Sequence, residues 1–573
     1  MDKLLKPLWG AVKQYRIVAF DTEDDSKGHV KQLSFAWYND AGEACFFDTT
    51  NPEEAVDWIY EQPTSVFVAH NLEYDLNNLL RDCDYKYIDQ IFYTARIVRA
   101  SFKNTRHTFF DSFNWFAKSL KKMGEVVGLE KLEMDLEDTV YVHRDAEILL
   151  KFVTMFQDML INEYHCSLAA TIGSISMQTY RRNYLKAPVQ PYNNPKCLNA
   201  YYGGRCELFY RGEIAGNINV IDVNSMYMYT MLNEYPDTST IEEGTYKEHT
   251  FGFGQFEVIC PESMFVPVLP QRNEEGRLTF PTGHFIGWWT YHEIRYAEKC
   301  GYKIVKQFEG YGTNKGQKYF FQFDTDIYKK RVESEGLFGK TVNKSIGVNL
   351  YGKFVQHKPQ TVARTELMSE EEMAETGARL THAIGPFYFY EIPLKEPPPT
   401  ANYLWGIYVT SYARIHLHKA MVCVHQSGGV LLYSDTDSIF YKGRKKVPGI
   451  EYDETKLGAF KAEQYVYGNF LISKGYILRD KKGEYKIACK GVPMPKWLSD
   501  PDKKHLKGTH ANPQIQFLLD GETEVTKPYR MREAMMQHQT PGVWHQAKKT
   551  NANVYERRTG KIGPTLPVIL KKV

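Results

Sequence analysis

Cysteine is scarce in this chain, and the nine cysteines among its 573 residues are scattered. They form no C-x-x-C pair and no zinc-type spacing with histidines, which argues against a disulfide scaffold or a zinc site. The sequence also lacks an apolar run long enough to cross a bilayer, and its first residues lack the apolar core of a signal peptide. We therefore expect a cytoplasmic protein with reduced thiols and no membrane association.

Net charge is almost absent overall, because 71 basic side chains oppose 69 acidic ones. The balance is uneven, however: residues 471–573 hold 20 basic and 9 acidic side chains, so acids outnumber bases in the rest of the chain. A basic lobe on an acidic body suits a protein that grips a polyanion beside acidic metal sites. The alternative is a solvated basic surface without a ligand.

The length and the 43% apolar content exclude a small binding module and a disordered chain. Strand-like runs over 15–25, 31–40 and 64–71, followed by a helical pattern from Asp138 onward, predict an α/β domain over the first ~165 residues. No internal repeat of fixed period is visible.

Four stretches of the chain beyond residue 234 have a predicted structure. Residues 235–320 read as short strands and turns, and a basic helix candidate runs from Ile327 to Gly352. A strand-like stretch then ends in the proline-rich linker 396–400. Residues 428–443 predict a hairpin of two apolar strands around an acidic turn.

Carboxylates stand where several of these elements end. Asp21 and Glu23 are two apart on a strand and share a face, and Asp75 could supply a third carboxylate. Tyr141 and Asp145 are four apart on a helix and also share a face. Oxygen ligands of this kind can hold two Mg²⁺ ions for phosphodiester chemistry. For each acid alone, a helix cap or solvated turn is the competing interpretation.

A second acidic group is predicted at the hairpin. Asp435 and Asp437 flank a single residue at its tip, where two like charges are unfavourable unless a cation compensates them. Asp222, at the end of another apolar strand, is the natural third partner. An ordinary acidic turn is the alternative.

These motifs, in this order, resemble a family B DNA polymerase with a 3′–5′ proofreading exonuclease, and most closely the protein-primed branch of small phages, adenoviruses and linear plasmids. Residues 21–23, 71–75 and 141–145 resemble the three exonuclease motifs. Residues 222–227 resemble motif A and residues 433–438 motif C. Motif B is matched at Lys344, Asn349, Tyr351 and Gly352, although Val348 and Asn349 replace its usual Asn-Ser pair.

The resemblance implies an α/β and α+β multidomain fold: an RNase H-like exonuclease domain followed by a right-hand polymerase with palm, fingers, thumb and two inserted subdomains. The implied boundaries are the exonuclease at 1–165, first palm part 166–234, first insertion 235–320, fingers 321–354, second insertion 355–400, second palm part 401–490 and thumb 491–573.

The resemblance also implies roles for individual residues in the exonuclease. Asp21, Glu23, Asp75 and Asp145 would be its catalytic metal ligands, with Tyr141 and Lys131 orienting the water and the scissile phosphate. Four further residues would hold a frayed 3′ end: Asn71, Tyr74, Ser119 and Leu120. Asp24 departs from the family pattern, which places a negative charge near the bound strand.

In the polymerase, Asp222 and Asp437 would hold the metals, with Val223 as a further metal and nucleotide contact and Asp435 assisting. The incoming nucleotide would meet Arg331, Lys344, Tyr227 and Tyr351. The implied DNA contacts are Tyr201, Gly203, Gly204, Lys474 and Tyr476. Met226 and Met228 replace the usual Leu and Pro of motif A, which is a change of apolar residues for apolar residues.

The function that follows is a monomeric, strand-displacing DNA polymerase that replicates a viral or plasmid genome, in the host cytoplasm if viral. Its cofactor would be Mg²⁺, two per site, with Mn²⁺ as a substitute. Its partners would be primer-template DNA, dNTPs and a terminal protein primer. The alternatives are a DNA-primed or primer-independent relative, and a stand-alone exonuclease with a non-catalytic DNA-binding lobe.

Overall fold

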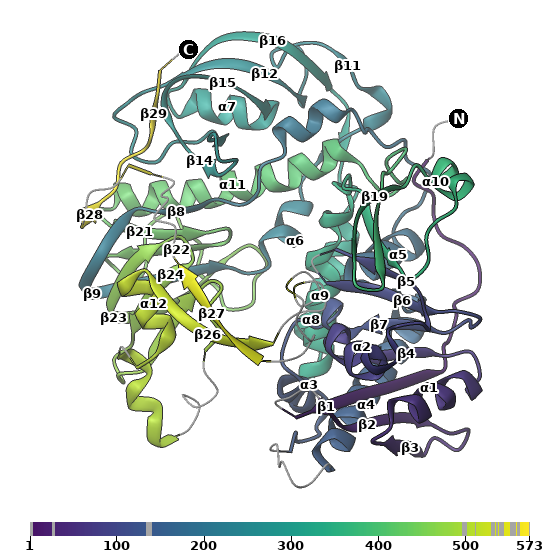
Figure 1. Ribbon diagram of the computed structural model, residues 1–573. Helices are drawn as coiled ribbons and strands as arrows, with labels where there is room; N and C mark the ends of the chain where they lie inside the picture. Colours follow the sequence, from purple (N-terminus) through teal and green to yellow (C-terminus); the bar gives the residue numbers. More distant parts are fainter. Residues whose placement is uncertain are drawn as a thin grey trace.

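The computed structural model describes residues 4–25, 29–94, 96–132, 140–494, 501–509, 511–528, 533, 537, 544–550, 557–558 and 562–571. Figure 1 shows the N-terminal α/β part on one side, the strands that carry the hairpin on the other, and a third sheet above both. No helix of the described residues is long and apolar enough to span a membrane.

The N-terminal domain is built on a mixed sheet with helices on its faces. Strand β1 pairs antiparallel with β2 and parallel with β4, and β4 continues parallel to β7. Its strands are β1 Ile17–Asp24, β2 Val30–Tyr38, β3 Ala44–Thr49, β4 Val66–Ala69, β5 Ile88–Tyr93, β6 Ile97–Phe102 and β7 Thr108–Asp111. Its helices are α1 Pro52–Glu61, α2 Leu72–Leu80, α3 Leu120–Val127 and α4 Val140–Tyr164. The predicted α/β domain is thus confirmed.

This sheet does not end with the N-terminal domain. Strand β18 (Gln360–Arg364) pairs with β5, and β20 (Phe387–Ile392) and β19 (Arg379–Ile384) extend the sheet to ten strands. Helix α10 (Glu370–Thr376) lies between β18 and β19 in the chain. The region predicted as a second insertion therefore completes the edge of the exonuclease-like sheet.

The predicted single basic helix up to Gly352 is wrong, because the structure has two helices here. Helix α8 (Phe321–Glu333) ends at Ser334, and α9 (Leu337–Asn349) begins after Gly336, which is extended with ψ 159°. The extended backbone at Gly336 cannot continue a helix. The two helices pack side by side (Figure 1).

The eight-stranded sheet that carries the hairpin has the order β25-β24-β23-β9-β22-β21-β8 with β28 attached to β9. Its main strands are β8 Cys206–Leu208, β9 Tyr210–Val223, β21 Val430–Asp435, β22 Ser438–Lys442, β23 Phe460–Ile472, β24 Gly475–Arg479 and β25 Tyr485–Cys489. Helices α6 (Met226–Met231) and α11 (Tyr403–Gln426) accompany it. The predicted hairpin is confirmed by the antiparallel pairing of β21 with β22.

Residues 235–320 form more regular structure than the short strands predicted. A five-stranded sheet, ordered β11-β16-β12-β15-β29, holds the long strands β12 (Phe251–Cys260), β15 (Thr282–Thr290) and β16 (Lys303–Thr313). Helix α7 (Tyr291–Lys299) starts at a capping box between Thr290 and Glu293, which the pattern analysis missed. Shorter strands complete this part: β10 Tyr235–Pro236, β11 Glu242–Glu243, β13 Gln271–Arg272, β14 Leu278–Thr279 and β17 Gly316–Gln317.

The C-terminal region holds α12 (Pro513–Asp520) and the hairpin of β26 (Glu522–Pro528) with β27 (Trp544–Thr550). Strands β28 (Gly563–Pro564) and β29 (Ile569–Leu570) then return to the sheets of the body. Much of the predicted thumb, 491–573, lies outside the described residues.

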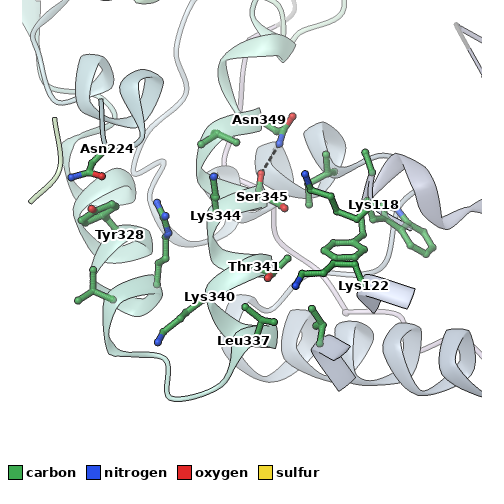
Figure 2. Close-up of a pocket in the computed structure, with 18 of the residues that line it drawn as sticks. Lys118, Lys122, Asn224, Tyr328, Leu337, Lys340, Thr341, Lys344, Ser345 and Asn349 are labelled. Carbon is green, nitrogen blue, oxygen red and sulfur yellow. Dashed lines mark hydrogen bonds between the residues drawn. The ribbon is translucent and has the colours of Figure 1, made fainter. Parts of the chain in front are cut away.

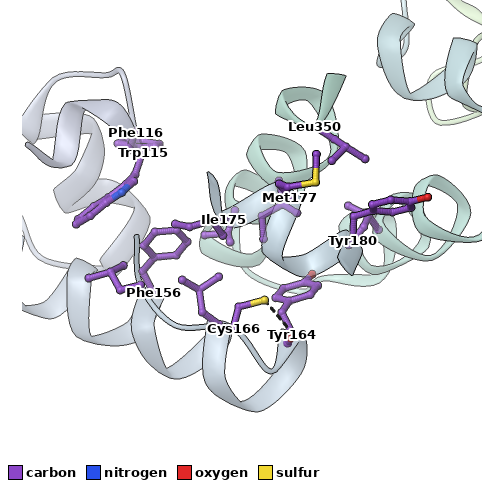
Figure 3. Close-up of a cluster of buried hydrophobic side chains, with 14 of the residues drawn as sticks. Trp115, Phe116, Phe156, Tyr164, Cys166, Ile175, Met177, Tyr180 and Leu350 are labelled. Atoms are coloured by element: carbon purple, nitrogen blue, oxygen red, sulfur yellow. Dashed lines mark hydrogen bonds between the residues drawn. The ribbon is translucent and has the colours of Figure 1, made fainter. Parts of the chain in front are cut away.

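One buried cluster joins the N-terminal domain to the helix pair through α5 (Ile172–Asn183). Figure 3 shows Phe156 and Tyr164 of α4 facing Ile175 and Met177 of α5, with Leu350 beyond. The Tyr164 hydroxyl also donates to Asn343 of α9. Each such apolar side chain contributes about 1.5–3 kcal/mol on burial, so the cluster fixes the two halves against each other.

Candidate active sites

The exonuclease-like site lies where β1 meets helices α2 and α4. Asp75, only 1% exposed, accepts hydrogen bonds of 3.0 Å from both the backbone N–H and the hydroxyl of Thr22, which places it beside Asp21. Burial, together with the neighbouring Glu23, raises the pKa of Asp21 to about 7, against the opposing charge of Lys131. Burial and the charge of Asp21 raise the pKa of Asp75 well above its usual range.

Helix α4 brings Tyr141 and Asp145 to the same place. Lys131 forms an ion pair with Asp145 through the Oδ2 atom. The Oδ1 atom of Asp145 is buried and accepts no hydrogen bond from the described residues. Burial and the nearby charges of Glu23 and Asp21 raise the pKa of the Tyr141 phenol. The structure therefore brings together the predicted carboxylates, the phenol and the lysine.

Within the described part of the chain, no three His, Cys, Asp or Glu side chains are already arranged as a complete metal cage. The donor chemistry nevertheless fits a divalent cation. Asp21 and Asp75 are buried and repel each other, and the Oδ1 atom of Asp145 has no hydrogen-bond donor among the described residues. A bound cation would stabilise all three carboxylates. The ammonium of Lys131 supplies part of that positive charge.

The residues predicted to hold a frayed strand surround this site. Asn71 has a left-handed backbone (φ 83°) at the start of α2, where its N–H donates to Asp111 and its side-chain oxygen accepts from Arg96. The Tyr74 hydroxyl donates to Asp24 at 2.7 Å. Asp24 is 6% exposed, so its charge is held inside the fold by Tyr74 and does not lie along an open groove.

Ser119 and Leu120 are placed by the start of α3. Ser119 caps that helix by accepting from the backbone N–H of Lys122, and Leu120 is its first residue. Ser119 thus has a structural role as a helix cap in addition to its predicted contact with a strand.

The second site lies where β9, β22 and the hairpin tip meet. Ser438 is directly opposite Asp222, and the N–H of Val223 donates to the carbonyl of Asp437 at 2.9 Å. Burial, followed by the charge of Asp222, raises the pKa of Asp437 to about 6. The pKa of Asp222 is also raised by burial. These two carboxylates therefore form the close pair that the sequence predicted.

Asp435 is held differently from the other two. Both of its oxygens accept from the Lys474 ammonium at 2.7 Å, and it also accepts from the Tyr433 hydroxyl. Tyr476 packs on Tyr433 and Phe440, with ring centroids 5.6 and 4.9 Å away. Lys474, predicted as a DNA contact, thus neutralises the third carboxylate, which agrees with an assisting role for Asp435.

Glycines 203 and 204 have different surroundings. A Cβ at Gly203 would meet nothing within 4 Å, whereas one at Gly204 would lie 2.7 Å from the Thr436 Cγ2 atom. Close contact with the hairpin tip therefore requires a glycine at position 204, and the approach of template phosphates to both glycines stays a prediction. Tyr201, just before them, accepts at its carbonyl from Arg272.

A cavity of about 820 Å³ opens between the N-terminal domain and the helices α8 and α9. Figure 2 shows Lys340 and Lys344 of α9 on one side and Lys118 and Lys122 of the N-terminal domain on the other. Six basic side chains line it: Lys118, Lys122, Arg331, Lys340, Lys344 and Lys461. Glu454 is its one acidic lining residue, so the cavity favours a polyanion of nucleotide size.

Arg331 and Lys344, both predicted, face the carboxylate pair from the helices. Arg331 donates to the Ser225 hydroxyl at 2.5 Å. Burial and the nearby Arg331 lower the pKa of Lys344. Lys461, which sequence reasoning missed, stands opposite Asp222 on β23 with its ammonium 3.7 Å from the carboxylate. Lys340 was also missed, although its i, i+4 spacing to Lys344 was a usable signal.

Tyr227 and Tyr351 come together beside this cavity. Tyr227 is the second residue of α6, which begins after Ser225 with its left-handed φ of 51°. The two rings lie 4.2 Å apart between centroids at 31°. The predicted pair of aromatic nucleotide contacts is thus in direct contact, although neither ring lines the cavity.

The fold and the two acidic sites define a multidomain protein in which an RNase H-like exonuclease domain precedes a right hand of palm, fingers and thumb with two inserted subdomains. A family model described as DNA polymerase type B, organellar and viral, matches residues 129–389. The chain is similar to these polymerases over that stretch, which confirms the resemblance indicated by its motifs.

Individual relatives agree with this placement. The DNA-directed DNA polymerase of Enterobacteria phage PRD1 is 26% identical over 519 residues, covering 84% of this chain and 86% of that protein. A probable DNA polymerase of Podospora anserina is 26% identical over 407 residues, 61% of this chain and 33% of the relative. The chain thus spans about a third of that fungal protein.

Solved structures show the same fold. Phi29 DNA polymerase matches with a TM-score of 0.71 at 17% identity, covering 94% of this chain and all of the other. Phi29 DNA polymerase complexed with primer-template DNA and incoming nucleotides matches with a TM-score of 0.69 at 18% identity.

Proposed function

We propose that this chain is a DNA-directed DNA polymerase with a separate 3′–5′ exonuclease site. The observation that carries the proposal is the pairing of Asp222 with Asp437 on neighbouring strands, facing the basic cavity of Arg331 and Lys344. A carboxylate pair opposite a polyphosphate-sized basic pocket suits nucleotidyl transfer.

The chain's own residues divide the work as follows. Arg331, Lys344 and Lys461 bind and neutralise the triphosphate, and Tyr227 with Tyr351 orients the sugar and base. Asp222 and Asp437, with the main chain at Val223, would hold Mg²⁺, or Mn²⁺ in its place. Two bound ions of this type lower the pKa of an attacking hydroxyl and stabilise the leaving oxygen.

In the exonuclease site, Asp21, Glu23, Asp75 and Asp145 would hold the second pair of ions. Tyr141 and Lys131 position the attacking water and the scissile phosphate, while Asn71, Tyr74, Ser119 and Leu120 hold the frayed end. Stacking on Tyr74 accepts any base, as proofreading requires.

The direct test is extension of a labelled primer on a template with a 5′ overhang, in Mg²⁺ and four dNTPs. We expect extension with dNTPs and 3′ trimming without them. A folded, metal-saturated protein that binds this DNA and does neither would contradict the proposal.

Protein priming and strand displacement belong to the same proposal. Ser119-Leu120 and Lys131 resemble exonuclease motifs of the protein-primed branch, and the chain contains both regions that the resemblance predicts as insertions. On a template with a downstream duplex, we expect products that continue through the duplex. Products that stop where the downstream duplex begins would contradict strand displacement but not the polymerase activity.

Lys344→Met tests the basic cavity. Loss of a charged contact to phosphate costs about 1.5–3 kcal/mol, so we expect the apparent dNTP affinity in single-nucleotide incorporation to fall roughly 10- to 150-fold. Lys329→Met is the matched control, because Lys329 lies exposed on α8 outside the cavity lining. Equal effects of both variants would contradict a specific role for Lys344.

Tyr227→Val tests sugar selection. A ring against the deoxyribose leaves no space for a 2′-hydroxyl, so the variant should raise ribonucleotide use relative to deoxyribonucleotide use at least about tenfold, or ~1.4 kcal/mol. Tyr227→Phe should change little, since the ring excludes the hydroxyl. The measurement is the ratio of kcat/KM for dGTP and GTP, and an unchanged ratio in the Val variant would move the selection to Tyr351.

A further inference from the structure

The C-terminal segment returns to the palm sheet, the eight-stranded sheet that carries the hairpin. Gly563 and Pro564 of β28 pair with Arg211 and Tyr210, and β29 pairs with β15 of the first inserted sheet (Figure 1). Between them, the N–H of Thr565 donates to the Phe209 carbonyl at 2.9 Å, and its hydroxyl donates to the Leu208 carbonyl at 2.7 Å. The segment therefore braces β8, the edge strand beside the catalytic β21.

This contact buries three charges. Arg205 donates from Nε to Glu207 Oε2 at 2.6 Å, and Arg557 Nη1 lies 3.5 Å from Glu207 Oε1. The exposed fractions are 1% for Arg205, 0% for Glu207 and 3% for Arg557. Two guanidinium groups thus share one carboxylate away from water.

The excess positive charge is met by acceptors fixed in the fold. Arg205 donates to the Pro267 carbonyl, and Arg557 donates to the carbonyl of Phe265 and the hydroxyl of Thr565. The guanidinium of Arg205 also lies 3.9 Å from the Phe280 ring centroid. A buried ionic group pays a large desolvation cost and tolerates little movement, so it fixes geometry more than it adds stability.

The same strand holds the catalytic hairpin. The N–H of Thr436, at the tip, donates to the carbonyl of Arg205 at 2.7 Å, and Cys206 is directly opposite Asp435. Thr436 has a left-handed backbone with φ 56°. It packs so closely against Gly204 that a Cβ at position 204 would have no room. The position of the hairpin tip relative to Asp222, called its height here, is therefore set by the backbone of Gly204–Cys206.

That backbone is held from its other side as well. Arg414 of α11 donates to the carbonyls of Tyr202 and Gly203 at 2.6 and 3.0 Å and pairs with the buried Glu293. The short segment 202–207 is thus fixed by one buried arginine before the glycines and by the Arg205–Glu207–Arg557 triad after them. Of these groups, only Arg557 comes from the C-terminal segment.

We propose that Arg557 is a positioning residue for nucleotidyl transfer, which acts through Glu207 and Arg205 to hold the Asp435–Asp437 tip at the height where Asp437 meets Asp222. This inference rests on the proposed polymerase function. Without Arg557, Glu207 keeps only Arg205 as an ionic partner among the described residues. The edge strand β8 then becomes more mobile, and the hairpin tip is no longer held in a fixed position. Substrate binding from the helices α8 and α9 should be unaffected, because the triad is held by contacts among its own residues and with Phe265, Pro267 and Thr565.

The test compares Arg557→Met with the control Arg558→Met, which removes a neighbouring charge on the same segment without a contact to Glu207. At saturating DNA and dNTP we expect Arg557→Met to lower kcat for extension at least about tenfold, since misplacement of reacting groups is costly. The dNTP KM should stay within about twofold and trimming should be unchanged. Arg557→Lys, which restores one charge, should recover part of kcat.

Two kinetic outcomes would overturn the proposal. Unchanged kcat with weaker DNA binding would make Arg557 a DNA contact, and a parallel fall of extension and trimming with the folded fraction would make it a general stability residue. If Arg557→Met does not fold, Arg557→Lys is compared with Arg558→Met instead, and we expect an intermediate loss of kcat.

A readout independent of activity separates this inference from the proposed function. Amide hydrogen exchange of the peptide around Thr436 should be at least about tenfold faster in Arg557→Met than in the wild type, while the peptide around Asp21 is unchanged. Equal exchange at Thr436 would overturn the positioning role. A wild-type protein that fails to extend DNA would contradict only the polymerase function.

Discussion

Asp437→Asn should lower primer extension at least about a thousandfold, or ~4 kcal/mol, while trimming of single strands continues. The Asn side chain keeps the shape of Asp437, and the main-chain bond from Val223 is unaffected, but one ionic ligand opposite Asp222 is lost. The measurement is single-turnover incorporation and trimming by the same preparation.

This variant should remain folded. Burial and Asp222 raise the pKa of Asp437 to about 6, so the ionised carboxylate destabilises the fold at pH values above 6. Removing that charge should therefore leave the Tm at pH 8 unchanged or higher. Asp435→Asn is the comparison: Lys474 already neutralises Asp435, so its loss of extension should be at least about tenfold smaller. Equal effects of the two variants would contradict the assigned roles.

Asp21→Ala combined with Glu23→Ala should abolish trimming and leave extension within about twofold of the wild type. Both carboxylates leave the same face of β1, beside Asp75, in a sheet that is separate from the palm sheet. The pKa of Asp21 is raised to about 7 by burial and by Glu23, so these charges also repel at neutral pH. Their removal therefore should not lower the Tm at pH 8.

The matched control is Glu53→Ala combined with Asp57→Ala, since both acids lie exposed on α1 of the same domain. This control should keep both activities. Trimming that survives the Asp21 and Glu23 double variant would show that the N-terminal domain has been wrongly assigned, whatever the polymerase does.

The local parts of both sites could be predicted because their residues are close together in the sequence, at spacings typical of one strand, helix or hairpin. Asp21 with Glu23, and Tyr141 with Asp145, follow from the periods of a strand and a helix, and the Asp435–Asp437 tip follows from its flanking apolar strands. Asp222 was placed beside them by its strand end, and the register of β9 and β22 agrees.

The parts that could not be predicted depend on contacts distant in the chain. Nothing local in β18 indicates that it pairs with β5, and Arg557 carries no sign that it reaches Glu207. Lys461 is close to Asp222 only through the register of β23. Helix α11 is buried on nearly every side, so it lacks the one-sided apolar stripe by which a surface helix is recognised.

The central claim is that one chain holds two separate acidic sites, one for extension and one for trimming. A single gel of wild type, Asp437→Asn and the Asp21 and Glu23 double variant on the same labelled primer-template tests it most directly. The wild type should show both products, Asp437→Asn only shortened strands, and the double variant only extended ones. Loss of both activities in either folded variant would contradict two independent sites.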